Sequence, residues 1–253
     1  MIHFKQYGQH DETLVVIHGL FGNSDNWHSI AQSLSEQFTV YCLDLPNHGK
    51  SSPLENAAYN VMAKEIHNWM QEQGLAQCFL LGHSMGGKVA MQFASQYPDM
   101  VKRLIVADIA PVNYESSHHV IFDGLKAIDL AQIKTRKEAD KILAQYVETL
   151  GVRQFLLKSL VKTESGFEWQ IHIDNLFNNY AQIRAIPPFV EAYQGETLFI
   201  KGENSDYIQA QHKESILTWF PQAKVKMIPG TGHWLHAEKP LPFTSLVKRF
   251  CQS

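Results

Sequence analysis

The chain has 253 residues, a formal net charge of −3, and a composition in which 45% of residues are hydrophobic and 19% are charged. This length can bury a large core, and the near-neutral charge argues against nucleic acid as a partner, because phosphate binding needs a concentrated basic surface. The densest basic cluster, Lys134-Thr135-Arg136-Lys137, is followed at once by Glu138, so we interpret it as a solvated helix face.

The apolar runs and the cysteines indicate in which cellular compartment the protein is expected. The segment Met1–Tyr7 lacks the basic and long apolar regions of a secretory signal. Apolar runs such as Leu14–Ile17 are far shorter than the ~20 residues that a membrane-spanning helix needs. Cys42, Cys78 and Cys251 are odd in number and far apart, which predicts neither disulfides nor a zinc site. We therefore expect a cytoplasmic protein with no membrane span, no metal and no other cofactor.

Short apolar segments rich in β-branched residues alternate along the chain with longer segments of helical spacing. This alternation predicts βαβ units and hence an α/β fold with a mostly parallel sheet covered by helices on both faces. Ile2–Tyr7 is expected to add one or two strands at the sheet edge. The main predicted strands are Thr13–Ile17, Phe38–Leu43, Cys78–Leu81, Arg103–Ala107, Thr197–Ile200 and Lys224–Ile228. The predicted helices are Trp27–Gln37, Tyr59–Gln73, Met85–Tyr97, Gln211–Phe220 and Leu241–Phe250.

The alternation stops between residues 113 and 188. No convincing buried strand is found there, and the pattern predicts several helices, among them Ile121–Leu130, Lys137–Leu150 and Val152–Val161. A helical insertion between two strands of one sheet explains this more economically than an independent second domain. We therefore predict a core domain formed by residues 1–112 and 189–253, with residues 113–188 as a helical cap over one end of the sheet.

The strongest chemical motif is Gly82-His83-Ser84-Met85-Gly86, which lies directly after a predicted strand and before a predicted helix. This is the context of a nucleophile elbow, a tight and strained turn that exposes the serine hydroxyl above the C-terminal edge of a sheet. Glycine at positions 82 and 86 avoids the clashes that side chains would make beside this turn. We predict that Ser84 is a nucleophile and not part of a structural glycine-rich turn.

A serine hydroxyl needs a base that accepts its proton as it attacks. Among thirteen histidines, His233 fits this role best, because it follows the last predicted strand within Gly230-Thr231-Gly232-His233-Trp234. Flexible glycines there can bring the imidazole to the same edge of the sheet. His236 is better explained as a loop or packing residue, and the histidines of the predicted cap as surface residues.

Acyl transfer also requires N–H donors for the negative charge that develops on the carbonyl oxygen, each worth roughly 2.7–4 kcal/mol. The first expected donor is the backbone N–H of Met85, next to the nucleophile. The second should come from the loop after the first main strand, where we favour the N–H of Leu20 and keep Phe21 as the alternative. His18 in the same loop is expected to hold the loop in shape.

These motifs together resemble the α/β-hydrolase superfamily from about residue 10 to the C-terminus. The resemblance is carried by His18-Gly19-Leu20-Phe21-Gly22, Asp44-Leu45-Pro46-Asn47-His48-Gly49-Lys50-Ser51, the serine elbow and Gly232-His233-Trp234. Within the superfamily, Asn47-His48-Gly49, Asp108–Val112 and Gly202–Tyr207 are most similar to the YbfF-type esterases. The resemblance implies an eight-stranded sheet, a helical cap and hydrolysis of a small-molecule ester or thioester.

The acid that orients the histidine has two candidates. The usual superfamily position is three residues past the glycine that closes the strand Thr197–Ile200, but here this position holds Ser205, which cannot act as an acid. Asp206 is one residue later. Asp108 follows a strand expected beside the nucleophile strand, and we favour it because it would be held rigidly near the histidine loop. Asp44 and Asp174 are better explained as polar residues of a loop and of the cap.

The same motifs leave other reactions open. A C–C bond hydrolase, a lyase or a cofactor-free perhydrolase would reuse serine, histidine and aspartate on this fold. A non-catalytic ligand-binding module is a further alternative, although a receptor would not need a complete set of catalytic groups. We predict a serine hydrolase that cleaves esters or thioesters through an acyl-enzyme, with Ser84 as nucleophile, His233 as base and Asp108 as acid.

Overall fold

A computed structural model describes residues 1–252 and has a seven-stranded sheet at its centre, with strand order β1-β3-β2-β4-β5-β8-β9. The edge strand β1 runs antiparallel to β3, and all other neighbours are parallel. The α/β fold class predicted from the sequence is therefore confirmed. The strands are β1 (Phe4–Tyr7), β2 (Thr13–Ile17), β3 (Thr39–Leu43), β4 (Cys78–His83), β5 (Val101–Ala107), β8 (Thr197–Gly202) and β9 (Ala223–Ile228).

The main sheet of the described chain has one strand fewer than the eight we expected. The difference lies at the N-terminus, where the opening segment forms the single strand β1 and not two. Residues 8–12 turn the chain directly from β1 into β2, and Gly8 adopts the left-handed conformation there, with φ 70°. A connection of this length leaves no room for another strand.

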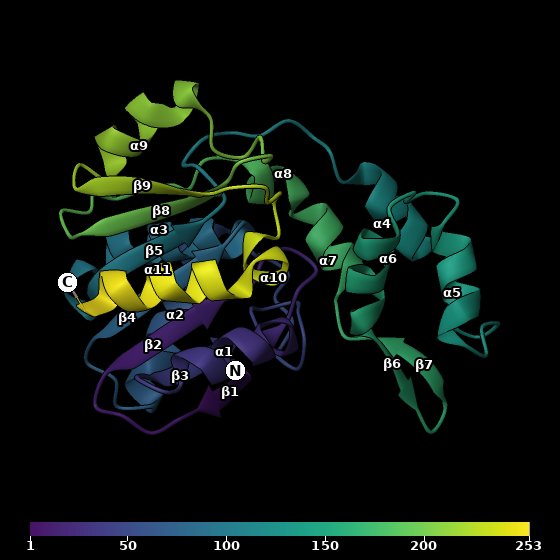
Figure 1. The fold of residues 1–253 in the computed structure, drawn as a ribbon. Coiled ribbons are helices and arrows are strands. Elements are labelled where there is room, and N and C mark those ends of the chain that lie inside the picture. The colour runs from purple at the N-terminus through teal and green to yellow at the C-terminus, as the bar shows by residue number, and fades with distance from the viewer. Residues whose placement is uncertain (253) are drawn as a thin grey trace.

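Helices cover both faces of the sheet (Figure 1). α1 (His28–Leu34) and α11 (Pro240–Gln252) lie on one face, and α2 (Tyr59–Glu72) and α3 (Met85–Gln96) on the other. Strand β2 is buried on both sides, with Leu14 and Val16 in the cluster under α1 and α11, and Val15 and Ile17 in the cluster under α2 and α3. The remaining core elements are η1 (Ser24–Trp27), η2 (Pro98–Met100), η4 (Ala210–His212), α9 (Lys213–Trp219) and α10 (Leu235–Glu238).

The chain between β5 and β8 leaves the sheet and lies to one side of it (Figure 1). We call residues 113–188 the inserted segment. It carries helices, as expected, but they are shorter than predicted; the helix expected over Val152–Val161 ends at Leu156. Its elements are α4 (His119–Lys126), α5 (Arg136–Leu143), α6 (Leu150–Leu156), η3 (Leu157–Ser159), β6 (Leu160–Thr163), β7 (Gly166–Trp169), α7 (Ile173–Asn178) and α8 (Tyr180–Arg184).

The expectation that this segment contains only helices was wrong, because β6 and β7 form an antiparallel hairpin. The hairpin is separate from the main sheet. Each of its strands has four residues, most of them partly or fully exposed. The hairpin therefore lacks the continuous apolar run by which buried strands are recognised in a sequence.

Lys88 in α3 binds both of the connections that join the inserted segment to the core. Its side chain is buried, and its ammonium donates hydrogen bonds to the carbonyl oxygens of Val112 (2.8 Å), Arg184 (3.0 Å) and Ala185 (2.6 Å). Val112 precedes the inserted segment, whereas Arg184 and Ala185 lie near its end. Burial lowers the pKa of Lys88 to about 7, while the three carbonyl oxygens favour the charged form.

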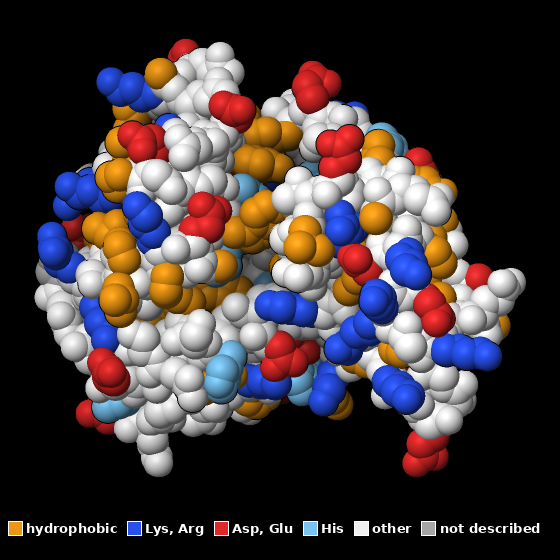
Figure 2. Space-filling view, turned by 45° about the vertical axis from the view of Figure 1, so that its right-hand side comes forward, with side chains coloured by type: hydrophobic (Ala, Val, Ile, Leu, Met, Phe, Trp, Pro, Cys, Tyr) orange, Lys and Arg blue, Asp and Glu red, His pale blue; other side chains and the backbone are white. Residues whose placement is uncertain are grey.

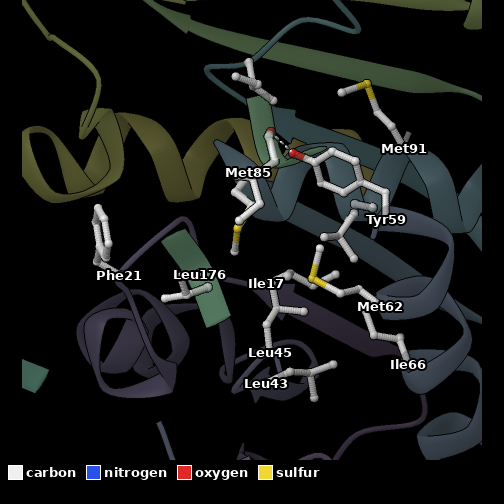
Figure 3. Close-up of a cluster of buried hydrophobic side chains, with 14 of the residues drawn as sticks. Ile17, Phe21, Leu43, Leu45, Tyr59, Met62, Ile66, Met85, Met91 and Leu176 are labelled. Atoms are coloured by element: carbon white, nitrogen blue, oxygen red, sulfur yellow. Dashed lines mark hydrogen bonds between the residues drawn. The ribbon is translucent and has the colours of Figure 1, made fainter. Parts of the chain in front are cut away.

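A second set of contacts joins the inserted segment to α2 and to the loop before it. The Tyr59 hydroxyl donates a hydrogen bond to the carbonyl of Ile183, within the buried cluster shown in Figure 3. The Asn179 side chain accepts from the Ala57 amide (3.0 Å) and donates to the Glu55 carbonyl (2.7 Å). The inserted segment is thus held to the core by directional bonds as well as by apolar packing.

Three further observations concern residues 1–252. Cys42, Cys78 and Cys251 are buried and unpaired. No helix in this range is long and apolar enough to cross a membrane. No three side chains of His, Cys, Asp or Glu in the same range are grouped in a way that could hold a metal ion.

We predict that Lys88→Met lowers the free energy of unfolding by about 2–4 kcal/mol, because it leaves three buried carbonyl groups without their donor. Gln92→Met is the matched control: Gln92 lies one turn further along α3, is equally buried, and its Oε1 has no hydrogen-bond partner in the described chain. That variant should lose less than about 1 kcal/mol. Equal losses in urea unfolding would contradict the role assigned to Lys88.

Candidate active site

Ser84 lies at the turn between β4 and α3, where it caps the helix with φ 52° and ψ −124°. A positive φ is strained for a residue with a side chain, so the surroundings must hold the turn in place. A Cβ on Gly82 would lie 2.2 Å from the Gly86 carbonyl oxygen, and a Cβ on Gly86 would lie 2.2 Å from that of His18. The two glycines are therefore required by close backbone approaches around the serine.

The register of β4, β5 and β8 brings Asp108 beside Ser84. His83 pairs with Ala107, which in turn pairs with Ile200. The Ser84 amide donates to the Ala107 carbonyl (2.9 Å), and the Asp108 amide donates to the Ile200 carbonyl (2.8 Å). Ser84 and Asp108 therefore follow directly on paired strand ends, and Asp108 also has a positive φ of 52°.

His233 connects these two side chains. It lies in the loop between β9 and α10; its Nδ1 is 2.8 Å from Asp108 Oδ2, and its Nε2 is 3.0 Å from Ser84 Oγ. The Asp108 side chain is fully buried and that of His233 is 17% exposed. Serine, histidine and aspartate thus form an unbroken chain of hydrogen-bonding contacts, in which Ser84 and His233 line a cavity and Asp108 does not.

The buried carboxylate of Asp108 has two further donors. The Gly202 amide donates to Oδ1 (3.0 Å), and the Ser205 hydroxyl donates to Oδ2. Both residues come from the end of β8 and the turn that follows it. Sequence reasoning set Ser205 aside because a hydroxyl cannot replace the acid, and it overlooked that the same side chain could bind an acid on the neighbouring strand.

The other carboxylates considered from the sequence make no hydrogen bond to His233 within the described residues. Asp206 is exposed and accepts a hydrogen bond from the Gln209 side chain (3.3 Å). Asp44 is buried, but its carboxylate organises loops, since it accepts from the backbone amides of Ser24 (2.6 Å) and Lys50 (2.9 Å). The carboxylate of Asp174 lies at the surface, 83% exposed and paired with Lys126.

Two backbone amides beside Ser84 are free to bind an oxyanion. The Met85 amide begins α3, and the first N–H of a helix has no acceptor within the helix. The Leu20 amide makes no hydrogen bond to another residue of the described chain. The Phe21 amide, by contrast, donates to His48 Nε2 (3.2 Å). Of the two sequence candidates in this loop, the geometry leaves Leu20 as the available donor.

Two buried histidines fix the loop that carries Leu20. His18 Nδ1 donates to the Gly19 carbonyl (2.8 Å), and its Nε2 accepts from the Leu45 amide (3.0 Å). His48 Nδ1 donates to the Pro46 carbonyl (3.0 Å). Burial lowers the pKa of His18 and lowers that of His48 to about 3, so both rings are neutral near pH 7. The shape-holding role expected for His18 matches these contacts, whereas the role of His48 was missed.

Aromatic and histidine side chains also surround the loop of His233. The Tyr207 ring stacks on the His233 imidazole, with ring centroids 4.0 Å apart. His83 Nε2 donates to the His233 carbonyl (2.8 Å), and burial holds the pKa of His83 well below its ordinary value. His236 stacks on Trp27 at 4.4 Å, which agrees with the packing role expected for it. These contacts restrict where the His233 ring can lie.

The site opens into a cavity with two lobes, which lie in the hollow between the core and the inserted segment (Figure 2). Lobe A, about 320 Å³, extends toward α3 and α8, where Met85, Lys88 and Ile183 line it. Lobe B, about 300 Å³, extends toward α6 and the loop after β2. Four residues line both lobes: Leu20, Ser84, His118 and Tyr207. Ser84 therefore lies where the two lobes meet.

A nucleophile elbow on a mostly parallel sheet, with a histidine and a carboxylate in contact with its serine, is the arrangement of a serine hydrolase. A family model of the α/β hydrolase fold matches residues 12–129. The chain is 38% identical to the sn-1-specific diacylglycerol lipase ABHD11 of Mus musculus, covering 94% of this chain and 80% of that protein. It is 35% identical to Esterase YbfF of Escherichia coli (strain K12), covering 96% and 94%.

Among solved structures, a marine microorganism esterase superimposes with a TM-score of 0.95 at 41% identity, covering 98% of both chains. The chain belongs to the α/β-hydrolase family. The resemblance inferred from its motifs is therefore confirmed over nearly the whole sequence.

The buried histidines should make the stability of the protein depend on pH. Burial lowers the pKa of His236 from 6.5 to about 3, so between these values the unfolded chain binds a proton that the folded chain does not. Stability is then lost as the pH falls from about 6.5 toward 3, by about 1.4 kcal/mol per pH unit for one such histidine. His236→Gln should make the pH dependence of urea unfolding shallower by about this slope. An unchanged slope in the His236→Gln variant would contradict this account.

Proposed function

We propose that Ser84, His233 and Asp108 act as a catalytic triad that hydrolyses carboxylic esters, and thioesters by the same chemistry, through an acyl-enzyme. The amides of Leu20 and Met85 serve as the oxyanion hole. Family membership makes the chain a carboxylic ester hydrolase, since the relatives reported above include esterases and a lipase. The observation that carries the residue assignment is the contact chain from Ser84 Oγ through His233 to Asp108.

In the first half-reaction, Ser84 Oγ forms a bond to the carbonyl carbon of the ester and gives its proton to His233 Nε2. The carbonyl oxygen takes up the negative charge and accepts hydrogen bonds from the amides of Leu20 and Met85. When the tetrahedral intermediate collapses, the bond to the leaving oxygen breaks. The leaving group keeps the bonding electrons and takes the proton from Nε2.

In the second half-reaction, water repeats these steps on the acyl-enzyme. His233 Nε2 accepts a proton from the water as its oxygen bonds to the acyl carbon. The bond to Ser84 Oγ then breaks, the serine recovers the proton, and the carboxylic acid leaves. The products balance as one alcohol (or thiol) and one acid for each ester and water consumed.

Asp108 supports this cycle in two ways. By accepting Nδ1–H from His233, it leaves the lone pair of Nε2 directed at Ser84 Oγ, and it stabilises the imidazolium that forms when the proton arrives. The donors from Gly202 and Ser205 hold the buried carboxylate in the orientation in which Oδ2 contacts His233 Nδ1.

The same proposal includes a cap, a small-molecule substrate and a reducing compartment. Residues 113–188 supply His118 and Ile183 to lobe A and Phe155 to lobe B, which supports their role as a cap over residues 1–112 and 189–253. The substrate is a small acyl ester that fits between the cap and the core. The three buried, unpaired cysteines fit a cytoplasmic protein.

The nucleophile is tested with a fluorophosphonate probe, which should label the wild-type protein covalently at Ser84. Ser84→Ala should abolish labelling and lower the turnover of p-nitrophenyl acetate by about 10⁶-fold, because within residues 1–252 no other hydroxyl is hydrogen-bonded to His233 Nε2. Circular dichroism should show an unchanged fold. Labelling that persists in the folded alanine variant would falsify the assignment.

The acid is tested by comparing the two carboxylates that the sequence offered for this role, of which Asp108 contacts His233. Asp108→Asn should lower kcat by about 10⁴, because the amide lets the imidazole adopt the wrong tautomer. Asp206→Asn should change kcat by less than about tenfold, because Asp206 lines lobe A but binds Gln209 and not His233. The opposite ranking of the two kcat values would transfer the role to Asp206.

A further inference from the structure

The two lobes that meet at Ser84 differ in their relation to His233. His233 and its neighbours His83 and Trp234 line lobe B and do not line lobe A. Lobe A is lined instead by Met85, at the start of α3. We propose that lobe A holds the acyl group and lobe B holds the leaving group of the substrate. This assignment rests on the proposed function and adds the direction in which the substrate lies.

The direction follows from the route of the proton. When the tetrahedral intermediate collapses, the leaving oxygen must lie within hydrogen-bond reach of His233 Nε2, since it takes its proton there. Nε2 lies 3.0 Å from Ser84 Oγ, on the side of lobe B. The rest of the leaving group is joined to that oxygen and extends into lobe B.

The acyl chain must then extend the other way. Its carbonyl carbon is bonded to Ser84 Oγ, and its oxygen points to the amides of Leu20 and Met85. With the leaving group on the histidine side, the remaining substituent of the tetrahedral carbon faces lobe A. The apolar side chains of Ile109 and Ile183 line this lobe beyond Met85, so the acyl group that it binds is a hydrocarbon chain.

Lobe B indicates the class of leaving group. None of the residues that line it is Asp, Glu, Lys or Arg. The buried His236 and the half-buried His118 stay neutral, because burial lowers the pKa of His236 to about 3 and that of His118 to about 4. Phe155 and Trp234 contribute aromatic rings to its wall. The leaving group is therefore a neutral, apolar alcohol, and the substrate carries hydrocarbon on both sides of its ester bond.

The cations at lobe A do not offer an alternative anion site. The ammonium of Lys88 gives its hydrogen bonds to three backbone carbonyls, and the Arg184 guanidinium donates to the Tyr114 carbonyl (3.1 Å). The carboxylates of Glu115 and Asp206 line the same lobe, so its two basic side chains are matched by two acidic ones. With two basic and two acidic residues at its wall, lobe A has no excess of positive charge for an acidic group and favours an uncharged chain.

The proposal is tested with two matched variants, Ile183→Trp and Val152→Trp. Both replace an aliphatic residue of the inserted segment, in α8 and α6 respectively, by one that fills its lobe. Ile183 lines only lobe A, and Val152 lines only lobe B. Hydrolysis of ethyl acetate, ethyl octanoate and octyl acetate is followed by pH-stat titration, so that the acyl and alcohol parts are lengthened separately.

Ile183→Trp should lower kcat/KM for ethyl octanoate by about tenfold or more relative to ethyl acetate and leave octyl acetate within about twofold. Val152→Trp should do the reverse. The exchanged pattern, or equal losses on both long esters, overturns the assignment of the lobes. If a tryptophan variant does not fold, the alanine variant at the same position is used, and it should widen its own lobe and raise the relative kcat/KM for the matching long ester only.

A substrate with a charged leaving group provides a further test of the proposal. An acetate ester of a phosphorylated alcohol of the same length as octanol should be hydrolysed at least about tenfold more slowly than octyl acetate, because lobe B offers no charged partner. Equal rates would overturn the neutral leaving-group class. A failure of the proposed function would look different: wild-type protein would hydrolyse none of these esters and would resist the fluorophosphonate probe.

Discussion

The site depends on the hydrogen-bonded register of three parallel strands, β4, β5 and β8. Because His83 pairs with Ala107 and Ala107 with Ile200, the residues that follow the first two strands emerge side by side at one sheet edge. The Ser84 and Asp108 amides are each held by a carbonyl of the neighbouring strand. These bonds help to maintain a positive φ in both residues, a conformation that an isolated turn would not sustain. Strain is thus stored at the positions of the proposed nucleophile and the proposed acid.

A carboxylate in a fully buried position is costly unless its oxygens are satisfied. Asp108 meets this requirement with donors from three parts of the chain: the Gly202 amide, the Ser205 hydroxyl and the His233 imidazole. Ser205 occupies the position that holds the acid in much of the superfamily. Two neighbouring strand ends therefore both contribute to the acid position. The carboxylate follows β5, and part of its hydrogen-bond shell comes from the turn after β8.

Around the proposed triad, buried polar side chains hold loops in place through hydrogen bonds to the backbone. His18 and His48 bind backbone groups of the loop that presents Leu20, and burial keeps both rings neutral. Lys88 does the same for the two connections of the inserted segment. Directional bonds of this kind fix one geometry, whereas apolar packing alone tolerates small displacements. A cavity whose walls come from segments far apart in sequence needs such constraints.

Local signals were sufficient for much of this protein. The strand–serine–helix motif, the glycines beside His233 and the period of the apolar runs depend on residues close together in sequence, and they predicted the fold class, the elbow and the contact between His233 and Ser84. The β6–β7 hairpin escaped prediction because its short, exposed strands leave no apolar pattern. The choice between Asp108 and Asp206 as the partner of His233 rested on strand order, which only suggested the answer.

Contacts between segments that are far apart in the sequence were decided only by the tertiary structure. Three contacts join residues that nothing in the sequence marks as neighbours. Ser205 binds Asp108, the Phe21 amide binds His48, and Lys88 binds both connections of the inserted segment. The two lobes arise in the same way, since their walls combine the inserted segment with loops of the core. Sequence patterns report the surroundings that a residue needs along its own element, whereas contacts between elements are set by how those elements pack.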